Sequence, residues 1–333
     1  MIYKDWVYGT VKIEDEVILD LMNTNAVQRL KGINQGGPLF LLNPNHFLNK
    51  YKTTRFDHSV GVCILLKIFN ASLEEQIAGL LHDISHMVFS HATDFLFNRN
   101  MQQDYHEIFH EKMILNSEIP FVLKKHNVNV KDILDNKKFT LLERNLPDLC
   151  ADRIDYFLRD MCVYDSLIKK KVNEILNSFT VFKKEIVFTS LDSAKLFAQK
   201  FIEANKMLYC NPLQSSLFKI ISDVLKSAMS KGFIIEDDLF STDNLILEKL
   251  RNSNDEEIID KLNLISNMEV IENKNNYDFH LKSKVRCVDP KIIADEKLVR
   301  LSDLDESYKK TMNDFISKTS NGFFTKIIKK NFN

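Results

Sequence analysis

Histidines and aspartates that could bind a metal ion gather in one apolar stretch of the chain, AGLLHDISHMVFSHATDF (78–95). The stretch contains His82, Asp83, His86, His91 and Asp94. Imidazole and carboxylate ligands together suit a divalent ion such as Mn, Mg, Fe, Ni, Co or Zn. Three or four protein ligands with one open position are typical of catalytic rather than structural metal centres. The stretch therefore indicates a metal site with a proton-transfer relay beside it.

A continuous helix cannot direct all of these side chains to one point. His82 and His86 are four residues apart and share a helical face, whereas His91 lies nine residues after His82, half a turn out of phase. The intervening ISHMVFSH contains no glycine or proline that would force a bend. A shared site therefore requires a bend whose cause the pattern does not reveal.

Three other segments carry residues of the same types. TTRFDHSVGV offers Arg55 and His58, DYHEIFHEKMI offers His106 and His110, and LCADRIDYFLRD offers Asp152, Asp155, Tyr156 and Arg159. On a helix Asp152, Asp155 and Tyr156 share one face, and from the residues alone Asp155 is the favoured carboxylate. A single histidine is more often a hydrogen-bonded core residue or an exposed one than a ligand. The prediction of a metal site therefore depends on the combination of these segments and not on any single histidine.

Composition places the chain among soluble globular proteins. Its 333 residues are 44% apolar and 27% charged, with a net charge of −1, so no basic field indicates nucleic-acid binding. The five cysteines lack CxxC spacing, which favours reduced thiols in a cytoplasmic protein. The chain has no apolar signal region and no run of about 18 apolar residues, so we expect no membrane span.

The elements that must position these residues are mainly helical. Low glycine and proline content favours helices, and we expect them at 58–70, 73–84, 104–116, 119–126, 146–160, 191–210 and 212–232, with two more within 240–266. Residues 16–33 predict two short helices, with Asn23 or Thr24 as the cap between them. Strands are expected at 5–13, 179–190, 268–281 and 283–293, and a solvated basic tail at 326–333. This is a mainly α fold with short N-terminal β elements and a small C-terminal α+β lobe, divided at 1–175 and 176–333.

Five ordered motifs resemble those of one family. VQRLKGINQGG, RFDHSVGV, IAGLLHDISHMVFSH, YHEIF and DRIDYFLRD resemble the motifs of the HD-domain metal-dependent phosphohydrolase superfamily. The likeness is closest to its deoxynucleoside triphosphate triphosphohydrolase branch and covers about the first half of the chain. Farther along, MLYCNPLQ resembles a weaker family segment, and KVRCVDP resembles a strand of uncharacterised relatives. The resemblance implies an HD-domain helical core within residues 1–175.

The resemblance also implies roles for single residues. The metal ligands it implies are His58, His82, Asp83 and Asp152, so Asp152 replaces Asp155 as the expected carboxylate. The relay that protonates the leaving group corresponds to His91, Asp94 and His106, with Glu107 orienting His106 and His110 facing outward. Substrate-binding residues correspond to Gln35, Arg55, Arg153, Tyr156, Asp160 and Tyr209.

The chain departs from the family pattern in three places, one of which is Arg153, where the family has a lysine. Ser85 and Met87 stand where the family has glycines, which permit close backbone approach. The loop between NQGG and TTRFDH is several residues longer than in the triphosphohydrolases and flanks the expected sugar-binding region. Substrate choice is therefore expected to differ.

The implied reaction converts a deoxynucleoside triphosphate into a deoxynucleoside and triphosphate with a divalent metal cofactor. One alternative is an HD-type phosphatase or phosphodiesterase acting on nucleoside monophosphates, cyclic nucleotides or alarmones, including a binuclear form. The other is a nucleotide-binding regulator without turnover. We expect a nucleotide as the ligand and a homo-oligomer, for which apolar helices after residue 190 could supply the interface.

Overall fold

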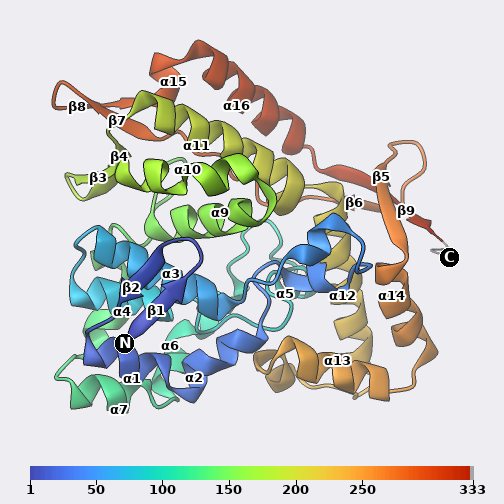
Figure 1. The fold of residues 1–333 in the computed structure, drawn as a ribbon. Coiled ribbons are helices and arrows are strands. Elements are labelled where there is room, and N and C mark those ends of the chain that lie inside the picture. The colour runs from blue at the N-terminus through green and yellow to red at the C-terminus, as the bar shows by residue number, and fades with distance from the viewer. Residues whose placement is uncertain (331–333) are drawn as a thin grey trace.

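Helices dominate the computed structural model, which describes residues 1–330 (Figure 1). The chain begins with an antiparallel hairpin of β1 (Ile2–Asp5) and β2 (Gly9–Lys12), followed by α1 (Glu16–Met22) and α2 (Asn25–Arg29). The Thr24 hydroxyl accepts a hydrogen bond from the Val27 backbone amide and caps α2. The predicted pair of short helices and its cap are thus confirmed.

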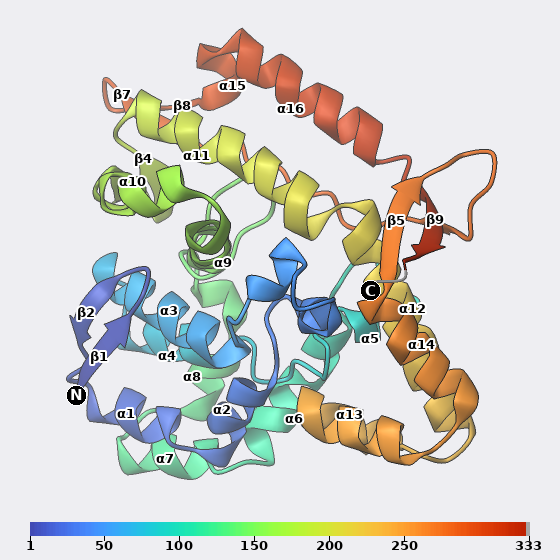
Figure 2. The ribbon, with the colours of Figure 1, turned by 45° about the vertical axis from the view of Figure 1, so that its right-hand side comes forward.

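Three helices position most of the predicted metal ligands: α3 (Arg55–Ile68), α4 (Leu73–Leu81) and α9 (Ala151–Tyr164). A capping box formed by Thr54 and Asp57 fixes the start of α3, and the Ser72 side chain caps α4. Helix α3 packs against both α4 and α9, and α9 also contacts α11 (Leu191–Ala204), as Figure 2 shows. This packing brings one end of each ligand-bearing helix to the same region.

The remaining helices surround this group. They are α5 (Ala92–Leu96), α6 (His110–Leu115), α7 (Ile119–Lys125), α8 (Val130–Leu134), α10 (Ser166–Asn177), α12 (Pro212–Ser230), α13 (Asp243–Asn252), α14 (Glu256–Ser266), α15 (Leu301–Leu304) and α16 (Glu306–Thr319). The mainly α class and most of the predicted helices are confirmed. The segment 104–116 starts as a 3-10 helix (Tyr105–Phe109), and α11 continues into a π-helix (Asn205–Tyr209).

Two small sheets complete the fold. One has the order β3 (Phe179–Phe182), β4 (Glu185–Phe188), β7 (Lys291–Ala294), β8 (Lys297–Arg300), and the other β5 (Met268–Glu272), β9 (Phe323–Lys329), β6 (Phe279–Leu281).

The strand predicted at 283–293 and the solvated tail predicted at 326–333 were each wrong in part. Residues 283–290 form an extended connector between the two sheets, and regular pairing starts only at Lys291. The expected basic tail contributes residues 326–329 to β9, because Phe323 and Thr325 are buried and Ile327 packs against the core in alternation. Residues 331–333 of that tail lie outside the described part of the chain.

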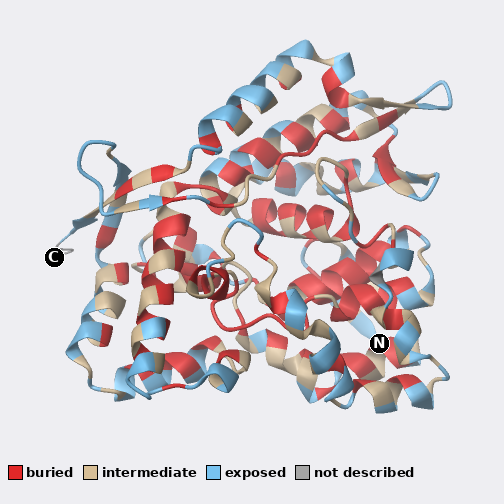
Figure 3. Ribbon diagram, turned by 180° about the vertical axis from the view of Figure 1, so that it is seen from behind, coloured by how far each residue is buried: buried red, intermediate tan, exposed pale blue. Residues whose placement is uncertain are grey.

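Buried apolar side chains form two clusters, and Figure 3 marks in red the buried stretches of the ribbon. The larger cluster joins α3, α4, α9 and α11 and reaches Phe315 on α16. The second centres on α12 and includes Tyr51 and Phe89. The larger cluster draws residues from both sides of the expected boundary at 175, and the division into two domains stays a prediction. No helix within residues 1–330 has the length and apolar character of a membrane span.

Candidate metal centre and catalytic pocket

Three helix ends meet at the candidate metal centre. His58 lies in the first turn of α3, His82 ends α4 and Asp152 lies in the first turn of α9. His58 Nε2 is 3.0 Å from Asp152 Oδ1 and 3.2 Å from His82 Nε2. Asp83 closes the group, with Oδ1 3.5 Å from His82 Nε2 and Oδ2 3.8 Å from His58 Nε2. The four predicted ligands therefore converge on one point.

Hydrogen bonds on the far side of each imidazole orient both rings. His58 Nδ1 lies 2.7 Å from Asp155 Oδ2, and His82 Nδ1 lies 2.7 Å from the Gly79 carbonyl oxygen. Both Nδ1 atoms face acceptors and therefore carry protons, which leaves both Nε2 atoms directed at the centre, an assignment inferred from the partners. Two Nε2 atoms and two carboxylates then face one another.

This donor set fits a divalent cation. Burial opposes charge at the Asp83 carboxyl, but Arg55 and the neighbouring histidines hold its pKa well below the usual range. Burial would lower the pKa of His58, yet hydrogen bonds to Asp152 and Asp155 raise it to about 10. The centre thus attracts positive charge, for which a metal ion competes with protons. Its mixture of imidazole and carboxylate supports a divalent metal without selecting one.

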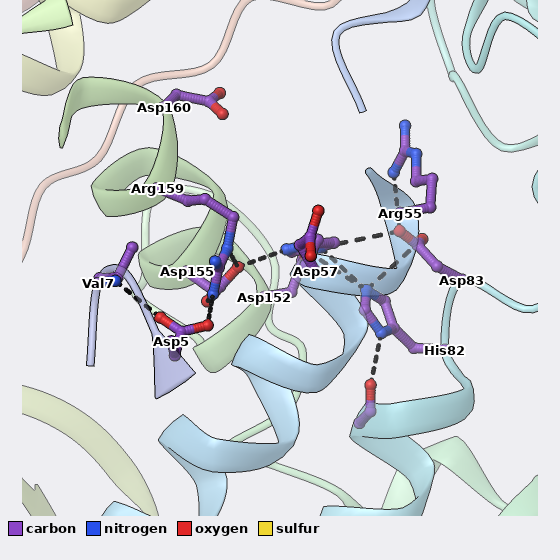
Figure 4. A network of polar contacts seen from close by, with 12 residues as sticks. Asp5, Val7, Arg55, Asp57, His82, Asp83, Asp152, Asp155, Arg159 and Asp160 are labelled. Carbon is purple, nitrogen blue, oxygen red and sulfur yellow. Dashed lines mark hydrogen bonds and ion pairs between the residues drawn. The ribbon is translucent and has the colours of Figure 1, made fainter. Parts of the chain in front are cut away.

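Asp155 lies behind the centre rather than in it. Its carboxylate accepts hydrogen bonds from His58, from the Tyr8 hydroxyl at 2.8 Å and from the Arg159 guanidinium at 2.8 and 3.0 Å. Arg159 also donates to Asp5 of the N-terminal hairpin at 3.0 Å. Figure 4 shows this buried line of charges leading toward the ligand cluster. The preference for Asp155 as a ligand, drawn from the residues alone, is therefore wrong, because this carboxylate binds the opposite ring nitrogen.

A turn without glycine supplies the bend between His82 and His91. Phe89 and Ser90 both have left-handed backbone angles, with φ of 55° and 52°. A bulky residue rarely adopts this region and needs support from its surroundings. The carboxylate of Asp243, the first residue of α13, accepts a hydrogen bond from the Phe89 backbone amide at 2.7 Å. The Ser90 hydroxyl donates a hydrogen bond to the Asn34 carbonyl oxygen at 2.7 Å. No local signal near either end identifies Asp243 as this support.

Beyond the turn lies the predicted relay. His91 Nδ1 is 2.8 Å from Asp94 Oδ2. The other carboxylate oxygen of Asp94 accepts a hydrogen bond from the Tyr105 backbone amide at 3.0 Å. Asp94 therefore positions His91. The His106 ring stacks on His86 with centroids 3.7 Å apart, and the centroids of His91 and His106 are 6.2 Å apart.

Two expected orientations near the relay differ in the structure. Within residues 1–330 no hydrogen bond joins Glu107 to His106, and Glu107 is exposed at the cavity edge, since the 3-10 helix directs it away from the ring. His110 does not face outward: its Nε2 lies 3.1 Å from the Leu81 carbonyl oxygen at the end of α4, and the residue lines the cavity.

A cavity of about 410 Å³ opens over the metal centre. All the predicted substrate-binding residues line it: Gln35, Arg55, Arg153, Tyr156, Asp160 and Tyr209. Arg55 is already engaged, since it donates to Asp83 at 2.8 Å and to Ser90 at 3.1 Å. Arg153 donates to the Asp148 and Arg144 carbonyl oxygens. The volume lies within the range of pockets for small ligands.

One end of the cavity presents polar atoms without partners. Gln35 Oε1 and Gln214 Oε1 are buried and make no hydrogen bond within the described residues, and the Tyr209 hydroxyl lies close to the Asp160 carboxyl. Burial also raises the pKa of Asp160 to about 6, and the Tyr51 hydroxyl donates to this carboxyl. Buried polar groups are normally hydrogen-bonded, so this end is suited to a ligand that carries hydroxyl or amide groups.

Among the cavity residues that sequence reasoning missed are Tyr51, Gln214, Lys284 and Arg286. Tyr51 comes from the long loop after NQGG, is fully buried and donates a hydrogen bond to Asp160. Gln214 closes the MLYCNPLQ segment, and Lys284 and Arg286 belong to KVRCVDP. Both segments had been noticed in the sequence, but neither pattern indicated that these side chains reach the site.

The helical fold and the His/Asp cluster define a metal-dependent phosphohydrolase of the HD type, and comparisons with known proteins agree. The HD domain family matches residues 55–160. The uncharacterized protein YdhJ of Bacillus subtilis is 38% identical over 328 residues, covering 98% of this chain and 99% of YdhJ. The chain belongs to the HD-domain superfamily of metal-dependent phosphohydrolases.

Other relatives carry descriptive names. The metal-dependent phosphohydrolase cns2 of Cordyceps militaris is 28% identical over 240 residues, 70% of this chain and 68% of cns2. A deoxynucleoside triphosphate triphosphohydrolase SAMHD1 homolog of Dictyostelium discoideum is 23% identical over 340 residues, 89% of this chain and 62% of that protein. A phosphohydrolase structure from Bacteroides thetaiotaomicron has the same fold, with a TM-score of 0.72, 18% identity and 99% coverage of both chains.

Proposed function

We propose that the protein hydrolyses a deoxynucleoside triphosphate to a deoxynucleoside and inorganic triphosphate. The observation that carries this proposal is one cavity lined by His82, Asp83, Asp152 and His91, with His58 directly behind the three ligands and unpartnered polar atoms at one end. The ordered motifs and the similarity to a named triphosphohydrolase homolog support the same substrate class.

In this proposal His58, His82, Asp83 and Asp152 hold a divalent ion. When bound, such an ion supplies positive charge to a phosphoryl oxygen and favours ionisation of water. Asp155 and the Gly79 carbonyl keep the two imidazole rings oriented for that task. Arg55 neutralises part of the charge of Asp83.

His91 serves as the general acid. Asp94 holds its Nδ1, so the opposite nitrogen is free to donate a proton to the departing 5′-oxygen. Burial lowers the pKa of His91, and Asp94 opposes this by stabilising the imidazolium form. Positioned acids of this kind contribute about 10²- to 10⁴-fold in rate. At the polar end, Gln35, Tyr209 and Asp160 are suited to hold the sugar.

Product analysis tests the proposal. Purified protein is incubated with each of the four deoxynucleoside triphosphates and Mn, Mg, Co, Ni or Fe, and the products are separated by ion-exchange chromatography. Release of triphosphate and a nucleoside in equal amounts is expected. Release of orthophosphate or pyrophosphate instead would overturn the proposed reaction.

A second candidate rests on a specific cluster. Ligand atoms of Asp83, His86 and His106 also lie within 4.8 Å of one another. They would allow a second ion beside the first, as a binuclear phosphatase or phosphodiesterase requires. A metal content near two per chain, with orthophosphate or a hydrolysed diester as product, would favour this candidate. The expected cytoplasmic location and homo-oligomer stay predictions.

A further inference from the structure

The connector between β6 and β7 carries two cations into the catalytic cavity. Lys284 and Arg286 line the same cavity as His82, Asp83 and Asp152, although they come from the C-terminal part of the chain. Lys282, two residues earlier, is exposed and does not line it. Along the connector, Lys284 and Arg286 reach the cavity, whereas Lys282 stays exposed to solvent.

Contacts with the segment after α5 hold the connector in place. The Asn100 side chain donates to the Lys282 carbonyl at 2.6 Å, and Lys284 Nζ donates to the Gln102 carbonyl at 3.2 Å. Arg286 donates to the Gln103 side-chain oxygen at 2.5 Å. All three partners follow shortly after the His91–Asp94 pair in the chain. The two cations therefore have fixed positions relative to the relay.

Neither cation has a carboxylate partner. The buried guanidinium of Arg55 pairs with Asp83, and that of Arg159 pairs with Asp155 and Asp5. Within residues 1–330, by contrast, no carboxylate oxygen lies within 4.0 Å of the charged nitrogens of Lys284 or Arg286. A partly buried cation without a counter-charge is costly, and such groups are normally paired. An anionic ligand bound in the cavity can supply the missing negative charge.

A third cation lies near these two. Arg153 lines the cavity, its hydrogen bonds run to neutral acceptors, and its Nε is buried without a partner among the described residues. Burial, together with the charges of Arg286 and Arg153, lowers the pKa of Lys284. Glu107 and Glu143 also line the cavity wall, but within residues 1–330 neither forms an ion pair with Lys284, Arg286 or Arg153.

We propose that Lys284 and Arg286, beside Arg153, form an anion subsite that binds the terminal phosphates of the substrate. The inference rests on the proposed function. It restricts the substrate of the protein to compounds with a polyphosphate tail, because a nucleoside monophosphate or a cyclic nucleotide has no group to occupy this subsite. Phosphate oxygens are suited to it because arginine binds them in a bidentate manner and lysine as a point charge. The C-terminal half of the chain then completes the substrate pocket.

Binding of inorganic tripolyphosphate tests the subsite apart from turnover. Metal-depleted full-length protein is titrated with tripolyphosphate and with orthophosphate by calorimetry, using the wild type, Lys284→Gln, Arg286→Gln and Lys284→Arg. Lys282→Gln is the matched control, because it removes the same charge from the same connector outside the cavity. Melting temperatures of all variants report whether the fold is retained.

Each neutral variant is expected to weaken tripolyphosphate binding by about tenfold or more, a magnitude expected for a charge-assisted contact. Orthophosphate binding should change less, Lys284→Arg should retain most of the affinity, and Lys282→Gln should match the wild type. Equal tripolyphosphate affinity in the wild type and both neutral variants would overturn the subsite.

Activity assays separate the two proposals. If the subsite is correct, Lys284→Gln and Arg286→Gln raise KM for a deoxynucleoside triphosphate but leave turnover of bis(p-nitrophenyl) phosphate, which has no tail, unchanged. An equal loss on both substrates would mean that the residues only support the fold and would contradict the subsite. Failure of the wild type to release triphosphate contradicts the proposed function alone, since tripolyphosphate binding is measured independently.

Discussion

His58 and Asp155 form a 2.7 Å hydrogen bond on the side of the imidazole ring opposite Asp152. The same ring thus links a carboxylate of the candidate metal centre to the buried Arg159–Asp5 ion pair of the N-terminal hairpin. The orientation of a proposed ligand therefore depends on residues that never face the cavity.

Asp155→Asn should weaken metal binding by about 10- to 100-fold, because partners behind a ligand fix its ring orientation. It also leaves Arg159 short of negative charge, so the free energy of unfolding should fall by about 3–5 kcal/mol. Manganese titration followed by electron paramagnetic resonance and urea unfolding measure the two effects. Tyr8→Phe is the control: it removes one hydrogen bond to the same carboxylate and should cost about 1 kcal/mol with little change in metal affinity. Unchanged manganese affinity in Asp155→Asn would contradict this role.

Gly61→Ala tests the same region from α3. A Cβ at this position would lie 2.0 Å from the Arg159 guanidinium and 2.1 Å from Asp155 Oδ1, so these groups must move. We expect a loss of about 1–3 kcal/mol of stability, as for other overpacked sites, together with weaker manganese binding. Ser59→Ala on the same helix removes a buried hydroxyl that has no partner in the described part of the chain, and it should be nearly neutral. A Gly61→Ala protein as stable as Ser59→Ala would argue against this close packing.

His91→Ala should lower kcat by about 10²- to 10⁴-fold while metal content stays at the wild-type level. His91 lies outside the proposed ligand set, and its Nδ1 is held by Asp94. His126→Ala, which removes a histidine paired with Asp20 and absent from the cavity lining, should leave kcat unchanged. Steady-state kinetics with metal analysis on the same samples separate the outcomes. Wild-type turnover in His91→Ala would exclude it as the acid.

Ionisation of the Asp148 carboxyl should make the free energy of unfolding depend on pH in the acid range. Burial opposes its ionisation, but Arg300, 2.6 Å away, and Lys291 lower the pKa of this carboxyl. A lowered pKa contributes stability above the unfolded-state value, about 3.9, and this stability is lost as pH falls through the folded-state pKa. Asp148→Asn should therefore cost about 1 kcal/mol at pH 7 because the ion pairs are only partly buried. Urea unfolding should show that the difference in free energy of unfolding between Asp148→Asn and the wild type shrinks toward pH 3. A difference that grows on acidification would contradict the stabilising role of the Asp148 ion pairs.

Much of the fold followed from helical periodicity and capping, as with Thr24 between α1 and α2. The ordered motifs identified the residues that converge, but spacing could not choose between Asp152 and Asp155, since both approach His58 and only the ring orientation separates them. The bend at Phe89 and Ser90 was invisible because Asp243, which holds it, lies far along the chain. Lys284 and Arg286 enter the cavity because their connector crosses between two sheets, a tertiary feature without a local signal.

The proposed activity requires that His58, His82, Asp83 and Asp152 bind one cation together. Anomalous diffraction from crystals grown with manganese measures this directly. We expect one strong manganese peak within bonding distance, about 2.0–2.3 Å, of ligand atoms from all four residues. Manganese bound elsewhere, or no peak among these four side chains at saturating manganese, would contradict the proposed centre.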